Sequence, residues 1–247
     1  MNNRAVLIIG VAILAVAVGL ELWYTNSNPV IPYAPTSFND TDLGQVKSFS
    51  YIKDGEVIGT YLYTVAVDRS ASPSPYTAST HSDITYKGSH IVLDTSLTFS
   101  STMAPRFYRV RATVNGTLST IACSFSPESV MIVNTSGGKN QNLTVSLPAG
   151  TVVVDNNNPA HWEILYRSFK PRLGKIYGMT AFVPQSGNVY DYQIGLDPST
   201  KPVTIEAQSY NCVVVREPDI GVVAYFYGGS LMRFDSQNDG VTIIRTP

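Results

Sequence analysis

The stretch Tyr76–Phe99, YTASTHSDITYKGSHIVLDTSLTF, shows most directly how this chain folds. In its second half, every other residue from Ile91 to Phe99 is apolar except Thr95, and the side chains between them are mostly polar. A period of two places the recurring residues on one face of an extended strand. Lys87-Gly88-Ser89 separates the two halves, so the stretch predicts an antiparallel β-hairpin with one face in a core.

Similar runs fill the chain on both sides of this hairpin. Asp54-Gly55 and Asn115-Gly116 predict two further hairpin turns, because these dipeptides supply the positive φ that tight turns need. The expected strands cover residues 46–52, 57–67, 76–86, 90–99, 106–114, 117–125, 129–133, 143–147, 151–154, 175–183, 189–194, 203–207, 210–215, 222–227, 230–234 and 241–245. We therefore expect a single all-β, mainly antiparallel domain over residues 43–247, with a large sheet curled into a half-barrel or folded into a sandwich.

The same alternation assigns side chains to faces. In the run 106–114, it places Tyr108, Val110 and Ala112 together with Arg106 on one face of the strand. One helix is expected to interrupt the strands, because Asn158 can cap it, Pro159 suits its first position, and apolar residues follow at helical spacing. We expect this short amphipathic helix to lie over the sheet.

The N-terminus carries an uninterrupted apolar run, Ala5–Leu20, preceded by Arg4. A transmembrane helix needs about 20 apolar residues, and residues 22–24 extend the run to that length. Residues 1–24 are therefore expected to anchor the chain in the cell membrane as a single pass with the C-terminal domain outside, followed by a proline-rich tether over residues 25–42.

Two other interpretations of the N-terminus remain open. Ala15-Val16-Ala17 matches the small-x-small pattern of a cleaved secretory signal, which would release a secreted domain. Arg4-Ala5 resembles the processing site of archaeal type IV pilin-like precursors, whose apolar helix packs into a filament core. In that case the protein would be assembled at the cell surface.

Charged residues make up only 14% of the chain, and the formal net charge is −1. No basic patch is visible in the sequence, so nucleic acid is not an expected partner. Many polar uncharged residues accompany this scarcity of charge, which suits a β-surface exposed outside the cell.

Two features fit an extracytoplasmic domain. The two cysteines, Cys123 and Cys212, lie in separate strand-like runs, and in an oxidising compartment the simplest expectation is one disulfide between them. Two separate buried thiols are the alternative. Asn-x-Ser/Thr sequons, which are candidate glycosylation sites, occur at Asn39, Asn115, Asn134 and Asn142.

No catalytic, cofactor or metal constellation stands out. The histidines are His81, His90 and His161, and none accompanies a Gly-x-Ser-x-Gly nucleophile motif. Asp235–Gly240 superficially suggests a calcium loop, yet it lacks the downstream acidic ligand and is better interpreted as a hairpin turn. We therefore expect no enzyme activity, no cofactor and no metal.

The order of features from Phe49 onward resembles uncharacterised bacterial and archaeal envelope domains related to the periplasmic lipoprotein-carrier half-barrels. The shared features are the aromatic strand Gly59–Tyr63, the Leu-Pro-x-Gly stretch Leu147–Gly150, a short helix, the strand ending in Phe182–Pro184, and the late stretch Gly229–Phe234. The resemblance implies a curved antiparallel sheet wrapped around a helix, with an apolar hollow that can hold an acyl or isoprenoid chain.

The sequence therefore favours a non-catalytic, membrane-tethered, extracytoplasmic β-domain that binds a lipid-like or other apolar ligand, or a partner protein, at the cell surface. The alternative is a structural subunit of a surface layer or pilin-like filament. A secreted hydrolase with dispersed catalytic carboxylates is a third class.

Overall fold

The computed structural model describes residues 29–38, 42–72, 74–155 and 158–246. Within these ranges no helix is long and apolar enough to cross a membrane, and the expected anchor, residues 1–24, lies outside them. The strands are β1 (Val30–Pro32), β2 (Lys47–Lys53), β3 (Glu56–Val67), β4 (Tyr76–Tyr86), β5 (Ser89–Phe99), β6 (Pro105–Val114), β7 (Thr117–Phe125), β8 (Ser129–Ser136), β9 (Lys139–Ser146), β10 (Val152–Val153), β11 (Ile176–Val183), β12 (Asn188–Leu196), β13 (Lys201–Ile205), β14 (Gln208–Glu217), β15 (Val222–Tyr227), β16 (Ser230–Ser236) and β17 (Val241–Arg245). The described helix is α2 (Pro159–Arg167).

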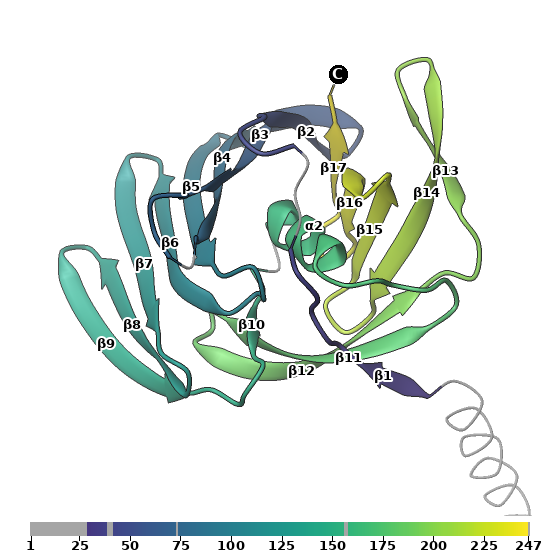
Figure 1. Cartoon of the computed structure of the whole chain (residues 1–247). Helices are drawn as coiled ribbons and strands as arrows, with labels where there is room; N and C mark the ends of the chain where they lie inside the picture. Colours follow the sequence, from purple (N-terminus) through teal and green to yellow (C-terminus); the bar gives the residue numbers. More distant parts are fainter. Residues whose placement is uncertain (1–28, 39–41, 73, 156–157, 247) are drawn as a thin grey trace, which may run out of the picture.

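All described strands belong to one curled sheet of 17 strands, which confirms the expected mainly antiparallel β class. The sheet contains two meanders, β2 to β9 and β11 to β17, and the last strand, β17, pairs antiparallel with β2. Ile243 lies opposite Tyr51 in this pairing. The strand order ends at β9 on one side and at β1 and β10 on the other, so the sheet is curled but not closed (Figure 1).

Local turn chemistry fixes the long hairpins. Asp54 and Gly55 have φ of 53° and 83°, and Asn115 and Gly116 have φ of 48° and 83°. Two successive positive φ angles define the tight turn that matches the twist of paired strands. The turn residues expected from the sequence therefore connect β2 to β3 and β6 to β7.

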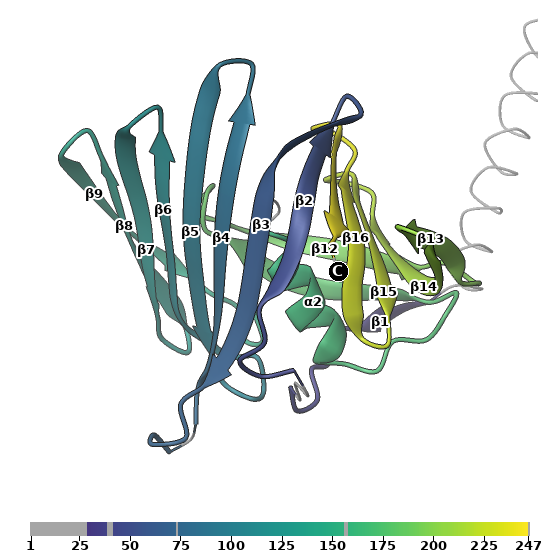
Figure 2. The ribbon, with the colours of Figure 1, turned by 90° about the horizontal axis from the view of Figure 1, so that it is seen from above.

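Helix α2 lies inside the curl of the sheet (Figures 1 and 2). The expectation from the helical pattern, that the helix lies over the sheet, is therefore wrong, whereas the resemblance implied a sheet wrapped around a helix. Residues 159–165 are all buried, including His161 and the carboxylate residue Glu163. The sheet wraps around the helix, and Trp162, Ile164 and Leu165 join the main apolar cluster. The helix thus fills part of the space inside the curl, and its apolar side chains form the centre of the core.

Part of the segment expected to be a tether belongs to the folded domain. Val30–Pro32 forms β1, which pairs parallel with β11, and the side chain of Phe38 is only 1% exposed. Phe38 packs edge-on against Tyr76 and Phe99. The prolines in this segment are compatible with a short edge strand, because such a strand leaves one row of backbone groups unpaired.

The expected disulfide is absent, because Cys123 and Cys212 are both free and buried thiols. Cys123 belongs to the main core, whereas Cys212 packs with Val203 and Met232 in a separate cluster formed by residues of β13, β14 and β16. Burial raises the pKa of the Cys123 thiol to about 12 and that of Cys212 to about 11. The alternative of two separate buried thiols is the correct one.

Candidate functional site

The N-terminus of α2 is held by a polar contact to the sheet. Asn158 caps the helix through its side-chain oxygen, which accepts from the Ala160 N–H at 3.2 Å. The Tyr61 hydroxyl, on β3, donates to the same Asn158 oxygen at 2.7 Å and accepts from Ala160 N at 3.0 Å. Asn158 Nδ2 donates to Thr80 Oγ1 on β4 at 3.4 Å. This end of the helix is therefore fixed against the concave face of the sheet.

A second polar group lies beside it, around the buried residue Asp155. The Tyr108 hydroxyl on β6 donates to Asp155 Oδ2 at 2.8 Å, and Gln185 Nε2 donates to the Tyr108 oxygen at 3.1 Å. The backbone N–H of Asp155 donates to His161 Nδ1 at 3.0 Å. Burial lowers the pKa of His161 to about 4 against the smaller opposing effect of Asp155. His161 is therefore a neutral imidazole at neutral pH, with Nδ1 as acceptor.

These polar groups form one end of a hollow of about 240 Å³ on the concave side of the sheet. Its apolar walls are Leu93 on β5, Val110 and Ala112 on β6, and Ile121 on β7. Figure 2 shows why the space exists: strands β3 to β7 extend well beyond the end of α2, so the helix covers only part of their concave face. The residues that complete the lining are polar or carry a hydroxyl: Tyr61, Thr80, Ser82, Thr95, Asp155, Asn158 and Gln185.

The hollow combines apolar walls with a fixed set of hydrogen-bonding groups. This is the usual composition of a small-molecule site, although the volume is slightly below the roughly 300–1,000 Å³ that is typical. Burial raises the pKa of Tyr61 and Tyr108 well above the ordinary value for tyrosine, so both hydroxyls keep their protons. The arrangement can orient the polar end of an amphiphile while its apolar part lies along β5 to β7.

At the other end of α2, a buried charge cluster holds the helix to the sheet. Glu163 is fully buried, and its Oε1 accepts from Lys47 Nζ at 2.5 Å while its Oε2 accepts from the Leu231 N–H at 2.9 Å. Arg167 reaches Asp42 at 2.9 Å and also donates to the carbonyl oxygen of Gly229. All these charges have partners within the protein, so the cluster is structural.

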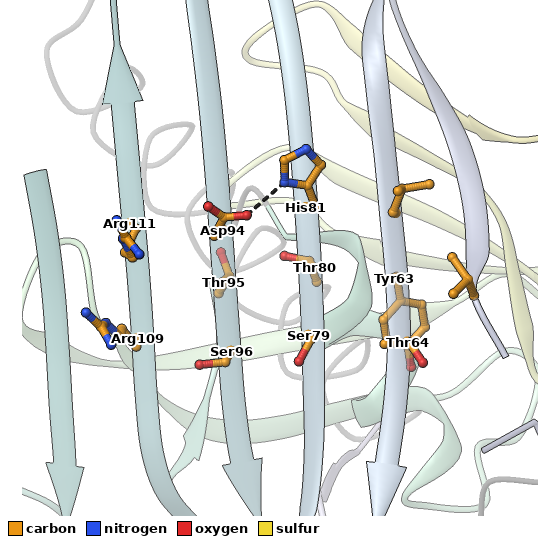
Figure 3. Close-up of a pocket in the computed structure, with 12 residues that line it drawn as sticks. Tyr63, Thr64, Ser79, Thr80, His81, Asp94, Thr95, Ser96, Arg109 and Arg111 are labelled. Carbon is orange, nitrogen blue, oxygen red and sulfur yellow. Dashed lines mark hydrogen bonds and ion pairs between the residues drawn. The ribbon is translucent and has the colours of Figure 1, made fainter. Parts of the chain in front are cut away.

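A larger and more open depression, about 440 Å³, lies on the outer face of β3 to β6 (Figure 3). His81 Nδ1 and Asp94 Oδ1 are 2.8 Å apart across β4 and β5, and Arg111 follows opposite Asp94 on β6. The side chains of His81 and Asp94 are 45% and 56% exposed, so water screens their interaction. Exposed pairs of this kind contribute roughly 0–1 kcal/mol, and we interpret the row as a solvated surface.

The remaining site residues from the sequence are dispersed. His90 Nε2 lies 2.9 Å from Asp83 on the exposed face. Asn115, Asn134 and Asn142 are exposed, whereas Asn39 lies outside the described residues. Asp235 in the suspected calcium loop accepts from Arg233 at 2.8 Å and belongs to the strand β16 before a hairpin turn. Within the described ranges, no group of three His, Cys, Asp or Glu residues could hold a metal ion.

The sequence did not identify the residues that line the polar end of the hollow. These residues come from three separate segments: Asp155 from the loop before α2, Gln185 from the turn between β11 and β12, and Tyr61 from β3. No regular spacing in the sequence relates them to one another. The only available signal was the alternation in residues 106–114, which correctly placed Tyr108, Val110 and Ala112 on one face.

The fold and the hollow define an open, curled β-sheet domain with an internal helix. No family model matches this chain, and no curated protein matches it. Among solved structures, it is similar to a β-barrel-like protein of the domain of unknown function DUF1849 from Brucella abortus, with 10% identity over 88% of this chain and 97% of that one and a TM-score of 0.47. It is also similar to a DUF1089 family protein from Pseudomonas aeruginosa, with 9% identity over 70% of this chain and 89% of that one and a TM-score of 0.41. Likeness at this level says nothing about function.

Proposed function

We propose that this chain is a non-catalytic, membrane-tethered, extracytoplasmic protein that binds an apolar or amphiphilic small molecule in the hollow beside α2. The observation that carries the proposal is the composition of the hollow, in which Leu93, Val110 and Ile121 face the fixed polar groups around Asp155. A ligand with a short alkyl or isoprenoid portion and a neutral hydrogen-bonding end would match both parts. The resemblance of the sequence to lipoprotein-carrier half-barrels implies a ligand of the same kind.

Filling the hollow should weaken ligand binding. Ala112→Trp places an indole among the walls of the hollow. We expect it to weaken binding of the small, neutral fluorescent probe N-phenyl-1-naphthylamine by about tenfold or more, and a tenfold loss corresponds to about 1.4 kcal/mol. The measurement is a fluorescence titration of the full chain held in solution by an amphipathic polymer, with the polymer alone as the blank. Unlabelled 1-decanol or geraniol as competitor distinguishes an alkyl from an isoprenoid preference, because both have ten carbons and a neutral hydroxyl.

Thr113→Trp is the matched control, because Thr113 is the next residue in β6 and its side chain points to the opposite face. It adds the same indole outside the hollow and should leave the probe affinity unchanged. Circular dichroism establishes that both variants are folded. Equal affinity of the folded Ala112→Trp variant and the wild type would contradict the proposed site, as would absence of any probe binding.

The membrane tether is proposed from the apolar run Ala5–Leu20. If residues 1–24 remain as an anchor, the mature chain keeps its N-terminal residues and stays in the membrane fraction after sodium carbonate extraction. N-terminal sequencing of the protein from its own membranes is the measurement. Loss of the first four or five residues would favour the filament alternative, and loss of the whole run would show a cleaved signal.

A further inference from the structure

The two edges of the curled sheet differ in kind. One edge consists of β1 and β10, which are three and two residues long and pair one after the other along β11. The other edge is β9, a regular strand of eight residues that pairs only with β8 among the described strands. Figures 1 and 2 both show β9 as the outermost strand, with no other described element beyond it.

The turn between β8 and β9 determines which backbone groups point outward. Gly137 and Gly138 have φ of 56° and 75°, so Ser136 and Lys139 close a two-residue hairpin as a hydrogen-bonded pair. The alternation then directs the backbone groups of residues 141, 143 and 145 toward β8. The Leu147 N–H, which donates to the Glu128 carbonyl oxygen at 2.8 Å, continues the same alternation. The free N–H and C=O groups of the edge therefore belong to residues Asn140, Asn142, Thr144 and Ser146.

β9 also lacks the features that usually prevent edge strands from pairing. Its residues 140–146 contain no proline and no charged side chain, and its pairing with β8 shows no bulge. Leu143, in the middle of the strand, is 54% exposed. An exposed, regular and uncharged edge of this length is a template for another strand.

We propose that β9 pairs antiparallel with β9 of a second copy of this chain, with the two-fold axis at Leu143. The four outward residues are symmetric about this position, so Asn142 faces Thr144 of the second copy and Asn140 faces its Ser146. Every free backbone donor and acceptor in residues 140–146 then has a partner. The exposed Leu143 side chains meet at the axis, and Lys139 lies opposite an apolar residue, Leu147, instead of another cation.

Self-complementarity favours a second copy over an unrelated strand. An interface that uses the same surface on both subunits closes on itself, so the pairing gives a dimer and not a filament. A single added strand pair buries less area than the roughly 1,200–2,000 Å² of a stable interface, so the dimer should form at micromolar or higher concentration. The sequon at Asn142 lies on this edge, and the test therefore uses protein produced without N-glycosylation.

Disulfide trapping tests the register. Residues that face each other at a non-hydrogen-bonded antiparallel position are about 4.5 Å apart at Cα, which is within disulfide reach. With diamide as the oxidant, Leu143→Cys should form covalent dimers about tenfold faster than Leu118→Cys, because only position 143 is held against its own copy. Leu118 is a matched control, since it is 45% exposed on β7, and the native thiols are buried in both variants. Equal rates for the two variants would overturn the proposal.

Sedimentation velocity of the full chain in detergent micelles gives an independent readout. Thr144→Pro removes an outward N–H without removing a hydrogen bond to β8, so it should abolish the dimer and leave the fold intact. Thr144→Ala keeps the N–H and should dimerise like the wild type. A wild-type chain that sediments like Thr144→Pro at all concentrations would overturn the proposal.

Discussion

Replacing Lys47 by methionine should lower the free energy of unfolding by about 3–5 kcal/mol, because it removes the main partner of a fully buried carboxylate. Lys47 Nζ lies 2.5 Å from Glu163 Oε1, and both side chains are almost completely buried. Arg167 Nε is 3.6 Å from the same oxygen and already donates to Gly229. It cannot replace the lost hydrogen bond without giving up that contact. Urea unfolding followed by circular dichroism measures the change.

Lys201→Met is the matched control for this variant. Lys201 also forms an ion pair, 2.8 Å from Asp197, but its side chain is 48% exposed. An exposed pair contributes roughly 0–1 kcal/mol, so this substitution should have little effect. In the double variant Lys47→Met with Glu163→Leu, much of the lost stability should return, because no uncompensated charge remains buried. Equal effects of Lys47→Met and Lys201→Met would contradict the assigned role.

The long hairpins were predictable because the alternation and the turn residues that determine each hairpin lie within the hairpin itself. The strands at 76–86 and 117–125 begin and end where the alternation and the turn residues placed them. Glycine after Asn115 fixes the turn, and the turn fixes the register of the strands on both sides. The helix was equally predictable, since the cap at Asn158 and Pro159 act within a single turn.

The curling of the sheet that brings β17 beside β2 could not be predicted in this way. The pairing of β17 with β2 joins segments nearly the whole chain apart, and neither strand carries a signal for its partner. Alternation shows which side chains share a face, but it does not show which face becomes concave. For the same reason, the burial of Cys123 in the main core and of Cys212 in a separate cluster was not visible, and the disulfide was wrongly expected.

The candidate site depends on this curling of the sheet. Tyr108 and Asp155 are brought to 2.8 Å only when the loop before α2 enters the curl. The apolar sequence of the helix accounts for its burial, but a buried Glu163 cannot be expected from sequence until Lys47 is placed beside it. Sequence therefore predicted the walls of the hollow better than its polar end.

Acidification should destabilise the protein between pH 6.5 and 4 through His161. Its pKa is 6.5 in an exposed chain and about 4 in the folded protein, because burial disfavours the imidazolium. The unfolded chain therefore takes up a proton in this range and the folded protein does not. The stabilisation that His161 contributes is fully present above its pKa in the unfolded chain. It decreases as the pH is lowered, and the decrease ends below the pKa of His161 in the folded protein. The full loss is about 3 kcal/mol.

The comparison with His161→Asn isolates this contribution from other titrating groups. The asparagine oxygen can accept the Asp155 N–H as Nδ1 does, but the amide stays neutral at all pH values. We expect the stability difference between wild type and variant in urea unfolding to shift by about 3 kcal/mol in favour of the variant between pH 7 and pH 4. His81→Asn, at an exposed position, should follow the wild-type curve more closely. If wild type and His161→Asn lose stability in parallel, the imidazole must be able to take up its proton in the folded protein. That would require water to reach the end of α2 that lines the hollow.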